Sequence, residues 1–414
     1  MRYAIVGFGP AGARAASAIR SRDPDGEIQV FSEEAHPFYF RAALPWYALG
    51  EITREQLWGF PEGYCEARGI KRVDARVEHV DTGARQLVTD AGDTFSYDRL
   101  LLSCGTAPAR MSCPGAELSG VLALNRLEDA DVLVARCREG GRAVVLGGGP
   151  RALTLAYVAR RLGMAVTLLV PGHAVGGEWL DARGAQIVFR RLAEDGVDVR
   201  LSDGLKQIEG EKGQVAAVVT AGGKGIACNW VGVGFDAIPR SGLLDGAGGG
   251  DAGGPRPVSE RMETALSDIF SAGDMCQVRD ATTGGYHRAT GWLAASLQGE
   301  VAGTNMAGGD AGYDPSRFFQ TTMLYDVPLT LIGRVHAEGD AEVTSSSSSE
   351  SYRRLVFKGG RLIGAIILGD RRHAHVVRRI VESEVNVHGH ELQLLRTDVD
   401  LNHLLRPSGE YHLY

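Results

Sequence analysis

Val144–Gly172 reads VVLGGGPRALTLAYVARRLGMAVTLLVPG, and this stretch decides the fold class. An apolar run, a glycine turn, a helix-forming segment and a second apolar run follow one another, as in a dinucleotide-binding unit. The turn has two of its glycines, and the small Ala152 takes the place of the third. The second strand ends at Val170, where a nicotinamide site normally presents a carboxylate to the adenosine ribose. The unit is therefore expected to keep its fold, while the sequence leaves open whether it still binds a nicotinamide nucleotide. The predicted nicotinamide contacts are Gly147, Gly149, Pro150 and Arg151.

The N-terminus repeats this plan. A strand over Tyr3–Val6 leads into a glycine turn and a helix, and the next strand, Ile28–Phe31, ends at two glutamates. The glycines allow a tight turn, a close approach of backbone amides to a pyrophosphate, and close packing of the helix on the strand. An acid at the end of the second strand accepts hydrogen bonds from the adenosine ribose. The predicted contacts of this second nucleotide site are Gly7, Gly9, Pro10, Ala11, Gly12, Glu33 and Glu34.

A third motif, DIFSAGD, spans Asp268–Asp274. A short apolar strand here ends at Gly273 and Asp274. A carboxylate and a helix N-terminus can then meet the ribityl and phosphate groups of a ligand.

Composition excludes several classes of function. The chain has 414 residues, too many for a single core, and a net charge of −7 without a run of Lys or Arg, so no nucleic acid partner is expected. No apolar run reaches the roughly 20 residues of a membrane span, and the first strand leaves no room for a signal peptide, which points to the cytoplasm. The cysteines form no CxxC or CxxxxC pair, so neither a metal site nor a vicinal dithiol is expected. They are Cys65, Cys104, Cys113, Cys137, Cys228 and Cys276.

Beyond Asp310 the pattern changes to short apolar strands and one helix-like segment, which predicts a small α+β domain. The low-complexity stretch Thr344–Ser351 is expected to be a mobile hairpin tip, and Gly246–Pro255 a flexible loop. The predicted fold class is α/β, with two dinucleotide-binding (Rossmann-like) domains plus a small C-terminal α+β domain. The predicted boundaries are 1–112 with 241–312 for the first nucleotide domain, 113–240 for the second, and 313–414 for the C-terminal domain.

Together with PFYFRAALPWY (Pro37–Tyr47) and SCGTAP (Ser103–Pro108), these motifs point to a family. Over nearly its whole length the chain resembles the flavoprotein pyridine nucleotide-disulfide oxidoreductase superfamily. Within it, the chain most resembles NADH:rubredoxin, ferredoxin and assimilatory nitrite reductase flavoproteins. The resemblance implies FAD on the first glycine turn, NAD(P)H on the second, and a C-terminal interface domain. It adds as cofactor-binding residues Arg41, Trp46, Cys104, Gly105, Arg126, Gly273, Asp274 and Trp292.

The chain departs from the family's pattern at several positions. Trp46 stands where many relatives carry a lysine near the flavin. Phe40–Ala43 occupies the place of the catalytic cysteine of disulfide reductases, so dithiol chemistry is not expected. Thr154 replaces a glutamate that helps to position the nicotinamide, and Val170 replaces the ribose-binding acid.

Five side chains each allow a structural interpretation as well. Arg41 fits a salt bridge as well as a cofactor contact. Cys104 is either a thiol close to the flavin or a small residue that fills a turn. Trp292 is a core aromatic or packs on the flavin, and the same holds for Trp46. His287, near a predicted flavin segment, fits a structural histidine.

These features favour an FAD-dependent oxidoreductase without a redox-active disulfide. It would take hydride from NAD(P)H and pass electrons to a small redox carrier or partner protein. The alternative is a flavin-bearing subunit of a redox complex with a degenerate, non-functional NAD(P)H domain. A weaker alternative is a flavin oxidase or thiol-linked reductase that uses Cys104. The sequence names no catalytic residue, no electron acceptor and no oligomeric state.

Overall fold

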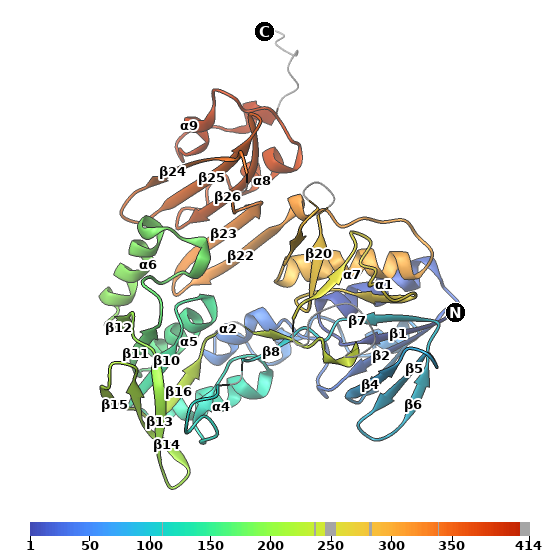
Figure 1. Cartoon of the computed structure of the whole chain (residues 1–414), viewed down its shortest axis with the longest axis horizontal. Helices are drawn as coiled ribbons and strands as arrows, with labels where there is room; N and C mark the ends of the chain where they lie inside the picture. The colour runs from blue at the N-terminus through green and yellow to red at the C-terminus, as the bar shows by residue number, and fades with distance from the viewer. Residues whose placement is uncertain (110, 236, 245–253, 281–283, 338, 406–414) are drawn as a thin grey trace. The chain divides into compact units, whose positions relative to one another are not determined.

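The computed structural model describes residues 1–109, 111–235, 237–244, 254–280, 284–337 and 339–405. Most of Gly246–Pro255, the predicted flexible loop, lies outside them. The chain packs as two compact units, each built from separate stretches of sequence, and Figure 1 labels their elements. The first unit comprises Met1–Ala43, Ile52–Pro108 and Ala237–Pro315, and the second comprises Leu44–Glu51, Ala109–Asp236 and Ser316–Tyr414. The division into three domains stays a prediction.

A five-stranded parallel sheet forms the core of the first unit, in the order β19-β7-β1-β2-β3. Val6, the last residue of β1, pairs with Phe31 on one side and Leu102 on the other, so the carboxyl ends of these strands share one edge. We call this the nucleotide edge, because ligands of such sheets bind beyond the carboxyl ends of the strands. The strands are β1 (Arg2–Val6), β2 (Glu27–Ser32), β3 (Ile70–Asp74), β7 (Arg99–Leu102) and β19 (Ile269–Ser271).

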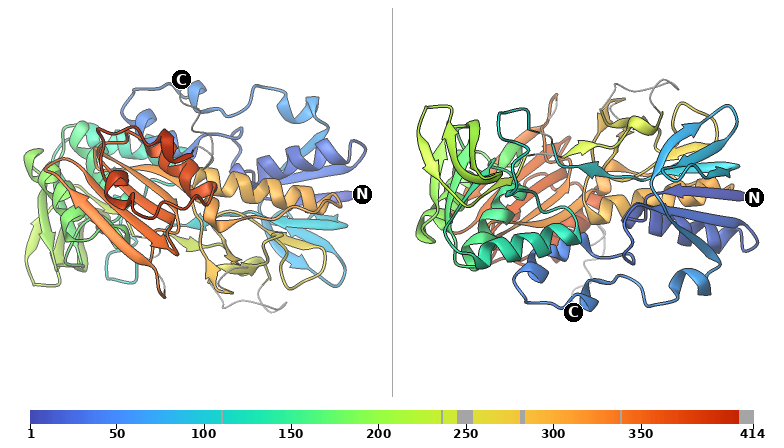
Figure 2. Two further views of the ribbon diagram at one scale, coloured as in Figure 1. Left: turned by 90° about the horizontal axis from the view of Figure 1, so that it is seen from above. Right: turned by 90° about the horizontal axis from the view of Figure 1, so that it is seen from below.

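Two helices of this unit lie side by side, α1 (Pro10–Arg22) and α7 (Trp292–Met306) (Figures 1 and 2). Their close packing depends on glycine. A Cβ atom at Gly299 would lie 2.1 Å from the carbonyl oxygen of Ala11, and one at Gly303 would lie 2.4 Å from that of Ala15. The nucleotide edge is therefore bounded by two helices whose backbones nearly touch.

Smaller elements complete the first unit. The helix α3 spans Tyr64–Ala67. An antiparallel sheet contains β4 (Val77–Asp81), β5 (Gln86–Thr89) and β6 (Thr94–Ser96). A mixed sheet contains β18 (Arg256–Val258), β20 (Cys276–Arg279) and β21 (Tyr286–His287), and a two-stranded ladder joins β8 (Thr106–Ala107) to β17 (Ile238–Pro239).

The second unit contains another parallel sheet, in the order β12-β11-β10-β16-β9. Its strands are β9 (Val121–Leu122), β10 (Arg142–Leu146), β11 (Ala165–Val170), β12 (Asp198–Leu201) and β16 (Trp230–Val233). The helices of this part are α2 (Leu44–Ala48), α4 (Leu127–Arg138), α5 (Pro150–Arg161) and α6 (Ala182–Glu194). An antiparallel sheet adds β13 (Leu205–Glu211), β14 (Gln214–Thr220) and β15 (Gly225–Ala227).

The helix α2 reaches the second unit from a stretch whose neighbours on both sides, Ala43 and Ile52, belong to the first. It contacts α4 and α5, and Leu44 and Ala48 are buried. The hydroxyl of Tyr47 donates a hydrogen bond of 2.6 Å to the carboxylate of Asp131 on α4. Eight residues are thus anchored in the second unit by both apolar and polar contacts.

The C-terminal part of the second unit is an antiparallel sheet in the order β22-β23-β26-β25-β24. Its strands are β22 (Phe319–Leu324), β23 (Val327–Gly333), β24 (Glu342–Ser347), β25 (Tyr352–Lys358) and β26 (Arg361–Leu368), and its helices are α8 (Ala374–Glu382) and α9 (Glu391–Leu394). The buried face of α8 packs on β23 and β26. Residues of this part of the chain also form hydrogen bonds with both ends of α6. Tyr352 donates one of 3.0 Å to Asp181, which caps the start of the helix, and Tyr325 donates one to Asp195 at its end.

The predicted fold class is confirmed: there are two parallel sheets with glycine turns and a C-terminal antiparallel sheet with helices. The expectation for Thr344–Ser351 was wrong in part. Its first four residues continue β24, which pairs with β25 from Glu342 to Ser347, and only the remaining residues form the turn.

Candidate functional site

The first glycine turn joins β1 to α1 at the nucleotide edge. Gly7 has φ of +103°, a conformation that favours glycine, and a Cβ atom there would lie 2.4 Å from the carbonyl oxygen of Ser103. The amide of Gly7 donates a 2.8 Å hydrogen bond to the carbonyl of Phe31. A Cβ atom at Gly12 would lie 2.0 Å from the carbonyl oxygen of Gly7, so α1 begins directly against the turn. The predicted roles of the first and third glycines in the fold thus have a steric basis.

Gly9 differs from its neighbours. It precedes α1 in an extended conformation that any residue adopts, and a Cβ atom on it would meet nothing within 4 Å. No side chain caps this helix end, and Pro10 occupies its first position. The amides of the first helical turn thus have no side-chain cap, and the positive end of the helix dipole lies at this turn, which suits a pyrophosphate. Ala11, also predicted as a contact, is buried against Gly299 of α7.

Glu33 follows β2 at the same edge. Its carboxylate forms an ion pair with Arg240, in which Nη1 of the arginine donates to Oε1. The two side chains are 25% and 30% exposed, so the pair is partly shielded from water. Sequence reasoning missed Arg240, because no motif marks it and it lies far from Glu33 along the chain.

Glu34 and Arg41 contact each other. Arg41 donates a 2.6 Å hydrogen bond from Nη2 to one carboxylate oxygen of Glu34, and Tyr39 donates one of 2.7 Å to the other. The guanidinium also lies 5.0 Å from the centre of the Tyr39 ring. These contacts tie the segment before α2 to the end of β2, so the salt-bridge interpretation of Arg41 has a geometric basis.

Cys104 and Gly105 form the turn after β7. The Cys104 thiol lies 3.6 Å from the carbonyl oxygen of Val6, and burial raises its pKa to about 12. A thiol with such a pKa is almost fully protonated at neutral pH, which supports a turn-filling residue and argues against a nucleophile. Gly105 has φ of +66°, and its carbonyl accepts a hydrogen bond from the amide of Arg240.

Gly273 and Asp274 lie directly after β19. The buried side chain of Gln298 accepts a 2.7 Å hydrogen bond from the amide of Gly273 and donates one to the carbonyl of Ala289. The carboxylate of Asp274 accepts a 3.0 Å hydrogen bond from the amide of Gly291, just before α7. Asp274 thus stands between a strand end and a helix start, as predicted, and it also holds the helix start in place.

Trp292 belongs to an aromatic cluster that the sequence did not indicate. Its ring centre lies 4.7 Å from that of Phe40 and 5.3 Å from that of Phe38. Phe38 in turn stacks on Phe60 at 4.8 Å and lies 5.9 Å from Phe8, the residue between the first two glycines of the turn. The cluster joins the glycine turn to the start of α7.

Two predicted cofactor contacts lie outside the first unit. Trp46 and Arg126 belong to the second unit: Trp46 is 45% exposed on α2, and Arg126 precedes α4, where its amide donates to Asp129. His287 lies in the first unit, 3.2 Å from the buried carboxylate of Asp280, an arrangement that fits a structural histidine.

The second glycine turn has the same backbone geometry as the first. Gly147 has φ of +113°, and Gly149 precedes α5 with open space around its Cβ position. The difference lies at Val170, which is only 3% exposed. Its methyl group would lie 2.8 Å from a Cβ atom on Gly148. An apolar side chain therefore packs on the middle of the turn where a ribose-binding acid is usual.

The turn's other predicted contacts, Pro150 and Arg151, open α5. Pro150 removes an amide that the helix start would leave unpaired, so the remaining free amides can meet a phosphate. The second turn thus shares with the first the features that suit a pyrophosphate.

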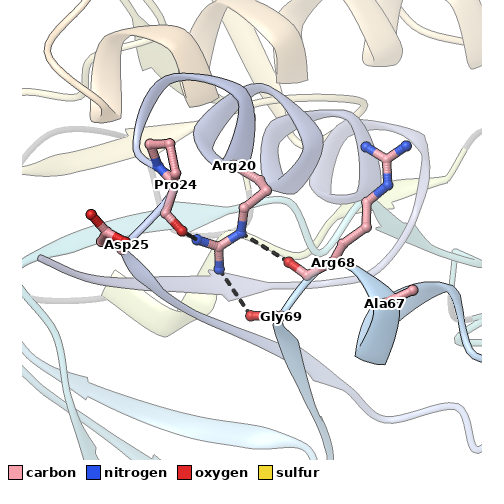
Figure 3. A pocket seen from close by; sticks show the side chains of 7 residues that line it. Arg20, Pro24, Asp25, Ala67, Arg68 and Gly69 are labelled. Atoms are coloured by element: carbon pink, nitrogen blue, oxygen red, sulfur yellow. Dashed lines mark hydrogen bonds between the residues drawn. The ribbon is translucent and has the colours of Figure 1, made fainter.

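A separate surface depression in the first unit offers no comparable chemistry (Figure 3). Arg20 dominates it, but its guanidinium donates to the carbonyl oxygens of Arg68 and Gly69 at 2.9 Å and to that of Pro24. The guanidinium of Arg20 thus already binds backbone carbonyl groups of two neighbouring loops. The depression is lined by Arg20, Pro24, Asp25, Gly26, Ala67, Arg68 and Gly69.

The described residues lack two other kinds of feature. No group of three or more His, Cys, Asp or Glu side chains there could hold a metal ion. In the same part of the chain, no helix has the length and apolar character that crossing a membrane requires.

Comparison with known proteins agrees with this geometry. The Rubredoxin NAD+ reductase C-terminal domain matches residues 323–385. The chain is 28% identical to a rubredoxin-NAD(+) reductase of Ectopseudomonas oleovorans, over 88% of this chain and 94% of that protein. It is 29% identical to the ferredoxin--NAD(+) reductase component of a biphenyl dioxygenase system from Paraburkholderia xenovorans, over 94% and 95%.

Solved structures agree as well. A ferredoxin reductase from Rhodopseudomonas palustris has the same fold, with a TM-score of 0.87 at 24% identity, over 97% of this chain and 99% of that one. The family described as pyridine nucleotide-disulphide oxidoreductase matches residues 1–299, which is most of the chain. The protein therefore belongs to the pyridine nucleotide-disulphide oxidoreductase family.

Proposed function

We propose that this protein is an FAD-dependent NAD(P)H oxidoreductase that delivers electrons to a small redox-carrier protein. The observation that carries the proposal is the open cradle at Gly9, with Glu33 and Asp274 at the same sheet edge, in a chain of this family. The names of its relatives, rubredoxin-NAD(+) reductase and ferredoxin--NAD(+) reductase, support a carrier protein as the electron acceptor.

In this proposal each part of the nucleotide edge binds a different part of FAD. Amides of the first turn, at Gly7, Gly9 and the start of α1, hold the pyrophosphate. Glu33 accepts hydrogen bonds from the adenosine ribose, and Asp274 binds toward the ribityl and phosphate end. When bound, FAD supplies the chemistry of accepting hydride and releasing electrons. Arg41, Trp46, Gly105, Arg126 and Trp292 remain proposed cofactor contacts.

The cysteines support electron delivery without a dithiol. No CxxxxC pair occurs in the sequence, and Phe40–Ala43 contains no cysteine. The Cys104 thiol, close to Val6, has a pKa of about 12 and is a poor nucleophile. This removes the support for a thiol-linked reductase.

A second candidate function is a flavin-bearing subunit without a nicotinamide substrate of its own. The buried Val170 favours it, because a bidentate ribose carboxylate contributes about 1.5–3 kcal/mol to binding. Against it stand the open Gly149 and the unblocked start of α5, which keep a pyrophosphate cradle. We therefore retain NAD(P)H as the electron donor.

Rapid mixing with NADH or NADPH in the absence of air decides between the two. If NAD(P)H is the donor, the yellow flavin absorption should bleach, and it should return when oxidised ferredoxin or rubredoxin is added. A Gly149→Val variant, whose side chain would fill the second cradle, serves as the matched control and should bleach far more slowly. No bleaching of the wild-type protein by either nucleotide would support the second candidate.

We also propose that the protein works in the cytoplasm. All six cysteines are free thiols, which is typical of proteins from a reducing compartment. Fractionation of cells, with the protein followed by antibody, tests this. Recovery in a periplasmic or secreted fraction would contradict it.

A further inference from the structure

The ion pair between Glu33 and Arg240 joins a predicted ribose-binding residue to one that no motif indicated. The guanidinium contacts Oε1 of the carboxylate, and both side chains are about three-quarters shielded from solvent. Exposed ion pairs contribute little, but shielding reduces the screening by water and salt. This pair is therefore expected to hold its geometry.

The backbone of Arg240 is fixed to the same sheet edge. Its amide donates a 3.0 Å hydrogen bond to the carbonyl of Gly105, in the turn after β7. The two residues before it form β17, which pairs with β8. The charges of Arg240 and Glu33 both act on the thiol of Cys104, which lies in this turn. The arginine thus reaches Glu33 from an anchored position.

We propose that Arg240 is a positioning residue for FAD, which orients the carboxylate of Glu33 toward the adenosine ribose. This inference rests on the proposed function. A carboxylate can accept about four hydrogen bonds, so a guanidinium and a ribose diol can share it. The planar guanidinium restricts the rotamers of Glu33, so that less side-chain freedom is lost when FAD binds.

Two other outcomes are open to experiment. If Arg240 competes with the ribose for Glu33, its removal tightens FAD binding. If the pair serves only the fold, its removal lowers stability and leaves FAD affinity unchanged. Titrations of the apoprotein with FAD, with ADP as a probe of the adenosine half, and with FMN, which lacks adenosine, separate these outcomes.

The variants are Arg240→Gln, Arg240→Lys, Glu33→Gln and the double variant Glu33→Gln/Arg240→Gln. We expect Arg240→Gln to raise the dissociation constants of FAD and ADP about five- to tenfold and to leave that of FMN unchanged. Arg240→Lys should recover part of the loss. In the Glu33→Gln background, Arg240→Gln should change the dissociation constants of FAD and ADP less than twofold, because the carboxylate that Arg240 contacts is gone.

Arg2→Gln is the matched control. Arg2 pairs with Asp98 at 2.8 Å at the start of β1, away from the nucleotide edge, and its removal should leave all three constants unchanged. An Arg240→Gln effect below twofold, tighter FAD binding, or an equal effect with and without Glu33 would overturn the inference. Thermal unfolding of each apoprotein checks folding, and if Arg240→Gln does not fold, Arg240→Lys decides. Failure of the wild-type protein to bind FAD would instead overturn the proposed function.

Discussion

Gly9→Ala should separate cofactor binding from folding. Gly9 has φ of −82° and ψ of −169°, which alanine adopts without strain, and the added methyl group would meet nothing within 4 Å. Alanine also has fewer unfolded conformations to lose, so the apoprotein should be as stable as the wild type or up to about 1 kcal/mol more stable.

FAD binding should suffer, because the methyl group would occupy the space through which the pyrophosphate reaches the start of α1. Loss of one charge-assisted hydrogen bond costs about 1.5–3 kcal/mol. The dissociation constant of FAD should therefore rise by a factor of about 10 to 150. The assay is fluorescence titration of apoprotein with FAD, beside thermal unfolding of the same sample.

Two further variants serve as controls for Gly9→Ala. Gly299→Ala places a Cβ atom 2.1 Å from the carbonyl oxygen of Ala11 and should destabilise the apoprotein itself. Gly149→Ala repeats the Gly9 change at the second turn, and should weaken NAD(P)H binding while FAD affinity stays constant. Unchanged FAD affinity in Gly9→Ala would show that the cradle is not where the pyrophosphate binds.

Four other predictions follow from single side chains. Burial and the neighbouring Asp181 raise the pKa of Tyr352, so the stabilisation from its protonated form is complete below pH 10 and is lost as the pH rises further. In Tyr352→Phe the free energy of unfolding, measured by urea titration, should therefore fall less steeply above pH 10 than in the wild type, with a difference in slope of up to about 1.4 kcal/mol per pH unit. Equal slopes for the two proteins would contradict this. Cys104 should react with iodoacetamide about a thousandfold more slowly than free cysteine at pH 8, as followed by mass spectrometry, and full labelling within minutes would refute its burial. Asp274→Ala should weaken FAD binding about tenfold, and it should lower the free energy of unfolding by about 1 kcal/mol because the hydrogen bond from the amide of Gly291 is lost. Asp274→Asn keeps an acceptor and should leave the stability unchanged. Full FAD occupancy in the alanine variant would show that Asp274 does not bind FAD. Because Val170 offers no ribose acceptor, the wild-type protein should discriminate between NADH and NADPH by less than about tenfold in kcat/KM, and a hundredfold preference in steady-state kinetics would show that another residue reads the ribose.

The parts of the site that depend on local backbone geometry could be predicted from sequence. Glycines at fixed spacing after an apolar strand indicated the turns at Gly7 and Gly147, since positive φ and close helix packing are local requirements. The Gly273–Asp274 turn was predicted for the same reason. The two parallel sheets followed from the repeated order of strand, turn, helix and strand.

Contacts between distant segments could not be predicted. Arg240 meets Glu33 only because β17 pairs with β8, a ladder too short to leave a pattern in the sequence. A nearby contact could not be predicted either. Glu34 is only a few residues from Arg41, but two charged side chains so close in sequence can be paired or apart in many loop conformations. The burial of Val170 on the second turn depends on how the strand end folds back, and one residue type does not determine that.

The helix α2 limits how this protein can be divided. A fragment cut as one continuous segment around the second parallel sheet would leave behind Leu44–Glu51, together with the hydrogen bond from Tyr47 to Asp131. The surfaces of α4 and α5 that α2 covers would then face water. A chimera that exchanges this sheet with that of a relative therefore needs two grafts, the sheet and these eight residues. Inheritance of this sheet as a single recombined block is disfavoured for the same reason.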